Sequence, residues 1–279
     1  MIEEIVLITG TSHGLGLSTA EMLAKQANEI KFKVYASMRN TNKKGELEKK
    51  IAGCSNLVVI ELDVCSEDSV NSAVKHILQK EGRIDIVVNN AAISWCGAIE
   101  VQPWDTITSL YDTNVFGPLR VIRAVVPSMK KNKKGRIINI SSVVGLHAFP
   151  FVTAYASTKY ALEGISDSLA PELATFNVHM ITIQPAGIAT GGEMTFSSEN
   201  LKDDDPTKVL GEKLIEKTSK MAAEAQSPEE VAEFILKAIT DENPQPHYVT
   251  NKGFEAFGKA KFCDLTGRIP FEMSKKFLE

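Results

Sequence analysis

Short apolar runs alternate with amphipathic segments along the first 190 residues of the chain. The first run, Ile5-Val6-Leu7-Ile8, is continuous, as expected for a strand that is buried on both faces of a parallel sheet. The alternation predicts strands joined by right-handed helical crossovers, with helices on both faces of the sheet. Further strands are expected at 32–37, 57–64, 84–92, 136–140, 178–183 and, at the edge, 245–251.

The length of 279 residues favours one large α/β domain, because no linker interrupts the chain before about residue 190. We expect a single doubly wound Rossmann-type domain over residues 1–252, with an about seven-stranded parallel sheet. Residues 191–226 turn polar and then give a modest helix pattern. They are either a substrate lid or an irregular surface excursion. Residues 253–279 form a C-terminal extension to which the pattern assigns no role.

Three of the expected helices contain a proline or a capping signal that predicts their local geometry. The first is expected over 104–131, with a kink near Pro118 because proline lacks a backbone donor. The second begins at about residue 153 and contains Pro171, where we expect a bend. The third starts at Ser227, where a serine N-cap, a proline and Glu230 predict a capping box.

Composition and charge exclude several classes of protein. Apolar residues make up 43% and charged residues 24%, which is ordinary for a soluble globular protein. The formal net charge of −4 argues against a nucleic-acid partner, because phosphate binding needs a basic face. The four cysteines are scattered without metal-ligand spacing, so we expect no metal site. Neither a signal peptide nor a transmembrane segment is expected, which favours a cytoplasmic location.

A glycine-rich turn follows the first strand and opens a helix. It reads Gly10-x-x-x-Gly14-x-Gly16. Missing side chains let a backbone approach a pyrophosphate, and the helix N-terminus offers unpaired N–H groups to it. The context of strand, turn and helix therefore predicts a dinucleotide site at the carboxyl ends of the strands. Other expected strand ends carry small or polar residues at Ser37, Asp63, Asn90 and Ser141-Ser142.

Tyr155 and Lys159 form the candidate catalytic pair. Residues four apart on a helix lie on the same face one turn apart, so the phenol and the ammonium can serve one pocket. A nearby cation favours the phenolate and is expected to lower the tyrosine pKa toward the range of a general acid/base. Because Tyr-x-x-x-Lys spacing is common, the prediction also depends on the glycine turn and on Ser142.

With these residues in place, the chain resembles the short-chain dehydrogenase/reductase family over roughly its first 190 residues. The motifs occur in the family's order: Thr9-Gly10-x-x-x-Gly14-x-Gly16, Asp63-Val64, Asn89-Asn90-Ala91, Asn114, Ser142, Tyr155-x-x-x-Lys159 and Pro185 to Thr190. The amino-acid sequences of residues 32–39 and 160–164 are similar to those of the 17β-hydroxysteroid and retinol dehydrogenase branch. Two positions depart from the family pattern, Ala92 and Ala186, where glycine is usual. Each added methyl is disfavoured only if the turn needs a positive φ.

The resemblance implies a role for each candidate residue. Tyr155 exchanges a proton with a carbonyl or alcohol, Lys159 lowers its pKa and holds the nicotinamide ribose, and Ser142 hydrogen-bonds the substrate oxygen. Asn114 positions a water that joins Lys159 to solvent. The cofactor-binding residues implied with Tyr155 and Lys159 are Thr9, Gly10, Ser12, His13, Gly14, Leu15, Gly16, Arg39, Asp63, Val64, Asn90, Ala91, Pro185, Gly187, Ile188 and Thr190.

The end of the second expected strand predicts which nicotinamide cofactor is used. NAD-specific sites place a carboxylate there for the adenosine ribose hydroxyls. This chain has Ser37-Met38-Arg39-Asn40 instead, and Arg39 offers donors suited to a 2′-phosphate. We therefore predict NADP(H), with His13 in a position where NADP-using members often carry a second cation. The alternative is that Arg39 merely begins a solvated loop.

The sequence favours an NADP(H)-dependent oxidoreductase of a lipophilic carbonyl or alcohol that is steroid-, retinoid- or acyl-like. A 3-oxoacyl-type reductase, a catalytically silent dinucleotide sensor or scaffold, and a sugar-nucleotide epimerase are the alternatives. The set Asn114, Ser142, Tyr155 and Lys159 argues against a silent protein, and the segment after residue 191 is short for a nucleotide-sugar domain. The helices that carry Asn114 and Tyr155 are apolar on more than one face and therefore need a second partner, and the resemblance implies that this partner is another copy in a homodimer or homotetramer.

Overall fold

A seven-stranded parallel sheet in the order β3-β2-β1-β4-β5-β6-β7 runs through the computed structural model, which describes residues 2–26, 30–189, 195–222 and 225–279. The predicted fold class is confirmed. The chain builds the sheet outward from β1 to β3 and then returns to the other side of β1 with β4, so the carboxyl ends of β1 and β4 flank the point of reversal, where this class of sheet binds ligands. The strands are β1 (Ile2–Thr9), β2 (Ile30–Met38), β3 (Leu57–Glu61), β4 (Ile86–Asn89), β5 (Gly135–Ile140), β6 (Val178–Gln184) and β7 (His247–Val249).

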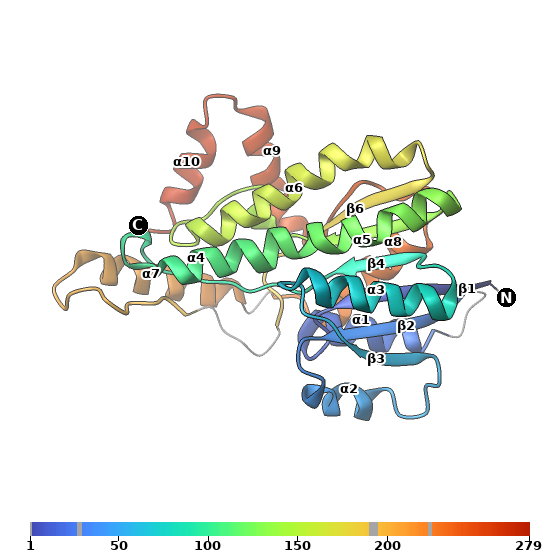
Figure 1. Ribbon diagram of the computed structural model, residues 1–279. Coiled ribbons are helices and arrows are strands. Elements are labelled where there is room, and N and C mark those ends of the chain that lie inside the picture. Colours follow the sequence, from blue (N-terminus) through green and yellow to red (C-terminus); the bar gives the residue numbers. More distant parts are fainter. Residues whose placement is uncertain (1, 27–29, 190–194, 223–224) are drawn as a thin grey trace.

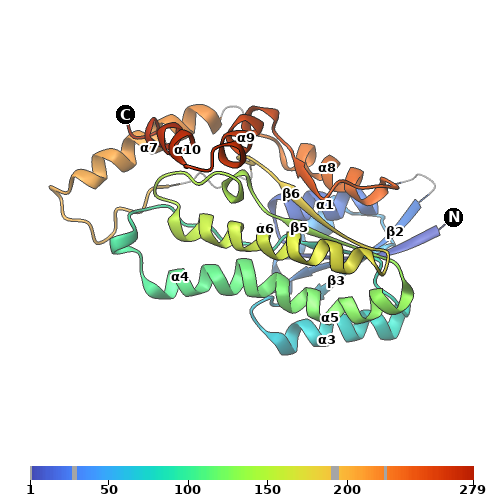
Figure 2. The same cartoon turned by 90° about the horizontal axis from the view of Figure 1, so that it is seen from above.

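Helices cover both faces of the sheet (Figures 1 and 2). One face carries α1 (Gly14–Ala24) and α8 (Pro228–Thr240), and the other carries α3 (Glu67–Glu81), α5 (Gly117–Asn132) and α6 (Thr153–Ala174). The continuous apolar run of β1 serves both layers at once. Val6 and Ile8 pack into the cluster that includes α1 and α8, while Ile5 and Leu7 pack into the cluster that includes α3 and α5.

The long helix expected over 104–131 is divided. It consists of α4 (Trp104–Tyr111), one π-helical turn (Asp112–Phe116) and α5. Pro118 has no N–H with which to continue the α-helical pattern, and the amide of Gly117 instead donates to the carbonyl of Asp112, five residues back. The expected kink is therefore a π turn. It turns the side chain of Asn114 into the interior, where only 1% of the residue is exposed.

The other sequence-level boundaries are close to those observed. Ser227 and Glu230 form the predicted capping box at the start of α8. Helix α6 begins at the predicted residue and continues past Pro171 to Ala174. The edge strand β7 is shorter than expected and pairs with β6 alone. The remaining helices are α2 (Gly45–Lys50), α7 (Pro206–Ala222), α9 (Glu255–Cys263) and α10 (Arg268–Lys275), with 3-10 turns at Thr41–Lys43, Ile99–Val101, Val143–Gly145 and Lys252–Phe254.

The C-terminal extension packs against the loop that follows β5. The Ser274 hydroxyl donates to the carbonyl of Ala148 and lies 2.9 Å from Nε2 of His147. Phe277 and Phe257 both make ring contacts with Phe149 of the same loop. The extension thus forms an aromatic cluster beside the candidate site, a role that the hydropathy pattern did not predict. In the parts of the chain that the structure describes, no helix has the length and apolar character needed to cross a membrane.

Candidate active site

The glycine turn after β1 needs its glycines for two reasons. Gly10 and Gly14 have φ of 71° and 58°, in the left-handed region that favours glycine. Gly16 is required by space, because an added Cβ would lie 2.3 Å from the carbonyl oxygen of Gly10 and 2.4 Å from Nδ2 of Asn90. The turn is therefore compact, with the start of α1 directed at the carboxyl ends of β1 and β4.

Side chains from two strands fix this turn. The Asn90 amide nitrogen donates to the carbonyls of Thr9 and Gly10, at 2.9 and 3.0 Å. The Thr9 hydroxyl in turn accepts hydrogen bonds from the backbone amides of Asn90 and Ala91. Thr11, which the sequence analysis did not name, donates from its hydroxyl to the Ser37 carbonyl, and the hydroxyl of Ser37, one of the expected strand-end residues, donates to the Ile8 carbonyl of β1. Thr9 and Asn90 thus shape the turn through their own side chains.

The other residues implied at the adenosine end differ in environment. Ser12 Oγ lies 2.9 Å from Nδ1 of the exposed His13. Asp63 accepts from the backbone amide of Cys65 with its carboxylate. Arg39 is exposed at the end of β2 and has no hydrogen bond or ion pair to any residue that the structure describes. Leu15 and Val64 are buried core residues, so only their backbone is available to a ligand.

Lys159 lies buried against the end of β5. Its ammonium donates a 2.8 Å hydrogen bond to the carbonyl of Ile140, and only 2% of the residue is exposed. Burial disfavours a charge, so it lowers the pKa of Lys159 to about 8, while the negative charge of Glu163 acts in the opposite direction. The lysine therefore titrates much closer to neutral pH than an exposed lysine does.

Tyr155 lies one turn before Lys159 on the same face of α6, as predicted, with the ammonium 5.8 Å from the centre of its ring. The expected effect on its acidity was wrong. Burial raises the pKa of the Tyr155 phenol, and the group that opposes this is Ser142, through a hydrogen bond, rather than Lys159. The physical reason is that the desolvation of a buried phenolate outweighs the pairing available to it. The phenol is accordingly held in its protonated form.

Ser142 stands where β5 and β6 end side by side. Its hydroxyl lies 3.3 Å from the carbonyl oxygen of Pro185, and the amide of Val143 donates to the same carbonyl. Gly187 accepts from the amide of Gln226, and Ile188 forms a bridge with Gln226. Neither Ala92 nor Ala186 has a positive φ, so the extra methyls cause no backbone strain. Thr190 lies outside the described residues.

Asn114 is fully engaged with protein partners. Its amide oxygen accepts from the backbone amide of Ile93, and its nitrogen donates to the Ile93 carbonyl and to the hydroxyl of Thr158. The side chain therefore joins the π turn to the loop after β4 and to α6. Because Pro118 has no N–H, the Asn114 carbonyl lacks the usual donor four residues ahead.

Apolar side chains surround the phenol. Tyr155 packs against a cluster that includes Cys96 after β4, Val152 before α6 and Leu214 of α7. Phe151, at a φ of 62°, and Phe196 meet edge to face at 5.1 Å in the same cluster. Tyr155 therefore lies against apolar side chains from three different parts of the chain. We refer to these residues, together with Val144, Phe149 and Ala156, as the Tyr155 cluster.

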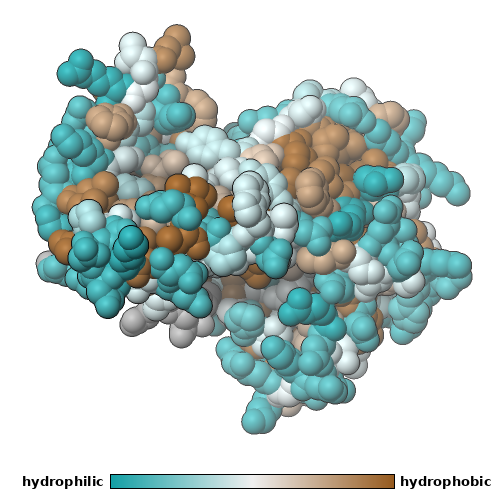
Figure 3. All heavy atoms as spheres, turned by 60° about the vertical axis from the view of Figure 1, so that its left-hand side comes forward, coloured by the Kyte–Doolittle hydropathy of each residue, from teal (hydrophilic) through white to brown (hydrophobic). Residues whose placement is uncertain are grey.

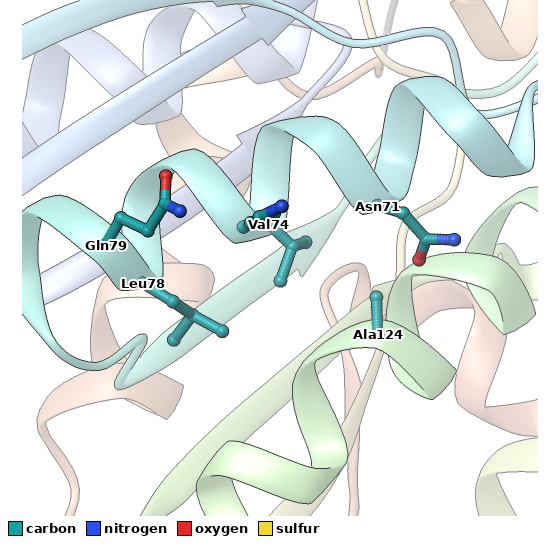
Figure 4. Close-up of a pocket in the computed structure, with 6 residues that line it drawn as sticks. Asn71, Val74, Leu78, Gln79 and Ala124 are labelled. Atoms are coloured by element: carbon teal, nitrogen blue, oxygen red, sulfur yellow. The ribbon is translucent and has the colours of Figure 1, made fainter.

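A surface groove and the distribution of metal-ligating side chains show whether a second candidate site lies elsewhere in the described residues. A groove of about 420 Å³ between α3 and α5 contains none of the predicted site residues and is lined by Asn71, Val74, Leu78, Gln79 and Ala124, among others (Figure 4). Among the described residues, no group of three or more histidine, cysteine or acidic side chains could hold a metal ion.

The family can be decided from the sequence match. Residues 4–201 match the family model described as short chain dehydrogenase. The chain belongs to the short-chain dehydrogenase family.

Relatives extend the match to nearly the whole chain. Retinol dehydrogenase 8 of Bos taurus is 34% identical, with 95% of this chain and 86% of the relative covered. Human 17-beta-hydroxysteroid dehydrogenase type 1 is also 34% identical, with 96% and 83% covered. A solved short-chain dehydrogenase from Streptomyces avermitilis has a TM-score of 0.82 at 27% identity and covers 98% of this chain and 96% of its own. ElxO with NADP bound has a TM-score of 0.76 at 26% identity and covers 91% and 100%.

The tight packing at the glycine turn gives a stability prediction. Gly16→Ala places a methyl against the Gly10 carbonyl and the Asn90 amide, and we expect it to lower the free energy of unfolding by about 1–3 kcal/mol. Gly45→Ala in α2 is the control, because an added Cβ meets nothing within 4 Å there. Urea titration of both variants measures the difference. Equal stability of the two would show that the turn is not closed as described.

Proposed function

We propose that the protein is an NADP(H)-dependent oxidoreductase that reduces a lipophilic ketone or aldehyde, or oxidises the corresponding alcohol. The observation that carries the proposal is the convergence of Tyr155, Ser142 and the buried Lys159 at the strand ends where the glycine turn opens α1. Each of these side chains occupies a position that suits one part of a carbonyl reduction.

Tyr155 and Ser142 supply the two hydroxyl groups for the substrate oxygen. Bound NADPH would supply the hydride, which leaves negative charge on that oxygen as it reaches the carbonyl carbon. Two fixed O–H donors stabilise this charge more strongly in the transition state than in the ground state. Because burial raises the pKa of Tyr155, the phenol is protonated at neutral pH and suited to donate its proton in the reductive direction.

Lys159 supports this proton transfer through its positive charge. In a loaded site its ammonium would hold the nicotinamide ribose and, by its charge, stabilise the phenolate that remains after proton transfer. Its pKa of about 8 means that this charge is present at neutral pH and lost above it. The Asn114 carbonyl, which lacks the usual helical donor, is the position proposed to bind a water on the route from Lys159 to solvent.

The proposed substrate class follows from the Tyr155 cluster, which presents aromatic and aliphatic side chains to the phenol. Names of similar proteins, retinol dehydrogenase 8 and 17-beta-hydroxysteroid dehydrogenase type 1, support a steroid- or retinoid-like compound. We further propose that residues 191–226, of which 191–194 and 223–224 lie outside the described residues, act as a lid. Leu214 of α7 belongs to the Tyr155 cluster, and the Ser197–Gly97 bridge ties this segment to the loop after β4.

The proposed preference for NADP(H) depends on Arg39. No carboxylate occurs between Ser37 and Asn40 that would repel a 2′-phosphate, and the Arg39 guanidinium is exposed and unpaired among the described residues. A planar fork of donors is suited to bidentate phosphate binding. The solved neighbour ElxO, with NADP bound, supports the same choice.

Tyr155→Phe tests the acid/base assignment. We expect activity on a carbonyl panel of ketosteroids, retinal and 3-oxoacyl thioesters to fall by about 10²–10⁴-fold, because general acid catalysis is removed. Binding of NADPH, followed by fluorescence titration, should stay close to the wild-type value. Tyr160→Phe on the same helix is the control, since that hydroxyl donates to the carbonyl of Leu146 outside the proposed chemistry. Near wild-type turnover in Tyr155→Phe would contradict the assignment.

Arg39→Ala tests the cofactor preference. A charge-assisted bidentate contact to the 2′-phosphate predicts a preference for NADPH over NADH of roughly tenfold to a hundredfold in kcat/KM. The variant should lose most of that preference, whereas the exposed Lys43→Ala should retain it. If wild type uses both cofactors equally, or if Arg39→Ala leaves the ratio unchanged, Arg39 does not bind the phosphate.

Homodimerisation through α5 and α6 is the third expectation. Partly exposed apolar side chains on these helices that lie outside the core clusters include Leu119 and Ile165, and Phe116 before α5 is 48% exposed. Figure 3 shows apolar surface gathered over this side of the molecule. A helix that is apolar on a second face needs a second partner.

Light scattering at micromolar concentration should give at least a dimer for the wild type, and Ile165→Asp should shift the mass to that of the monomer. Phe262→Asp on α9, where the side chain is 70% exposed, is the control and should leave the mass unchanged. A monomeric wild type would refute the proposed interface.

A further inference from the structure

Glu163 continues the row of Tyr155 and Lys159 along α6. The three residues are spaced four apart, so they lie on one helix face. Glu163 is only 7% exposed, and carboxylates are almost never buried unless they are paired. Its Oε2 accepts a 2.9 Å hydrogen bond from Nε2 of Gln184 and lies 3.4 Å from Nδ1 of His247. Its Oε1 is buried without a hydrogen-bond partner in the described residues.

The position of this carboxylate matters for the buried lysine. Within the described part of the chain, Lys159 has no acidic partner within 4.0 Å, and its one hydrogen bond goes to the Ile140 carbonyl. The charge that counteracts its desolvation is that of Glu163, one turn away. In a buried site such an attraction is screened less than at the surface.

We propose that Glu163 is a positioning residue for the reaction: its carboxylate keeps the Lys159 ammonium charged, and Gln184 and His247 hold the carboxylate in place. The inference depends on the proposed function, because it assigns a purpose to the charge of Lys159. Glu163 is not a member of the set Asn114, Ser142, Tyr155 and Lys159, so its proposed role is additional to theirs.

Among the described residues, the titratable groups around the pair are Tyr155 and Asp167 on α6 and His247 on β7. His247 also contacts Asp167, at 2.8 Å from its Nε2. The hydrogen bond with Glu163 raises the pKa of His247, burial opposes this, and the charges of Glu163 and Asp167 add to it. As the pH rises through that pKa, His247 loses its positive charge.

The described groups that contact Lys159 or Glu163 from elements other than α6 and β7 do not ionise. The Ile140 carbonyl of β5 contacts Lys159, and the Gln184 amide of β6 contacts Glu163. Gly145 of the 3-10 turn also lies close, since an added Cβ there would be 3.1 Å from Cγ of Glu163. Glu163 is therefore the acidic group whose removal should act on Lys159 most directly.

Glu163→Gln tests the proposal, because it removes the charge and keeps the shape. In protein labelled with ¹³Cε-lysine, the Lys159 resonance is assigned by its loss in Lys159→Arg, and its pKa is read by NMR titration. We expect the pKa in Glu163→Gln to be at least ~0.5 pH unit lower than in the wild type. The alkaline limb of kcat/KM against pH should move to lower pH by a similar amount. Asp167→Asn, which removes the other carboxylate on His247, should leave both unchanged.

An unchanged Lys159 pKa in Glu163→Gln overturns the inference. So does a loss of activity that is uniform across pH, because that indicates a structural role alone. If Glu163→Gln does not fold, Glu163→Met removes the charge at similar volume and is judged by the same criteria. The NMR titration needs no substrate, so it can fail while the carbonyl assay succeeds. Conversely, a wild type that reduces no carbonyl would refute the proposed function and leave the measured coupling intact.

Discussion

A cation buried where β5 ends is the constraint on which the rest of the site depends. The ammonium of Lys159 lies in the interior with one carbonyl as its hydrogen-bond partner, an arrangement that costs free energy because it removes a charge from water. The cost appears as a pKa of about 8. Sites that retain such a costly group usually use it, and here the phenol that accompanies it is directed into an apolar cluster.

The neighbouring helices and strand ends hold this cation and the phenol in place. Helix α6 sets their spacing, and the π turn brings Asn114 into contact with Thr158 beside Lys159. Ser142 is fixed by the side-by-side ends of β5 and β6, and the glycine turn by Thr9 and Asn90. Parallel strands bring these distant segments to one edge, which is why the fold gathers chemistry there.

Much of this was available in the sequence. The apolar run of β1 predicted a strand buried on both faces, and the spacing of Tyr155 and Lys159 predicted one helix face, because both periods are local properties. Glu163 follows Lys159 by four residues on the same helix face, so the sequence could also have identified it. The raised pKa of Tyr155 could not be predicted, since burial depends on the packing of Cys96, Phe196 and Leu214 from distant segments. The aromatic contacts of the C-terminal extension were missed because phenylalanines without a clear period do not indicate their partners.

Hydride transfer is the reaction proposed for this site, and isotopic labelling tests it most directly. The wild-type protein is incubated with a ketosteroid, retinal or a 3-oxoacyl thioester and with NADPH carrying deuterium at C4 of the nicotinamide, in the 4R or the 4S position in separate reactions. Mass spectrometry of the product is expected to show one deuterium at the former carbonyl carbon from one of the two labelled forms and none from the other. Tight binding of NADPH with no deuterium in any product would contradict the account and support a dinucleotide-binding protein without redox chemistry.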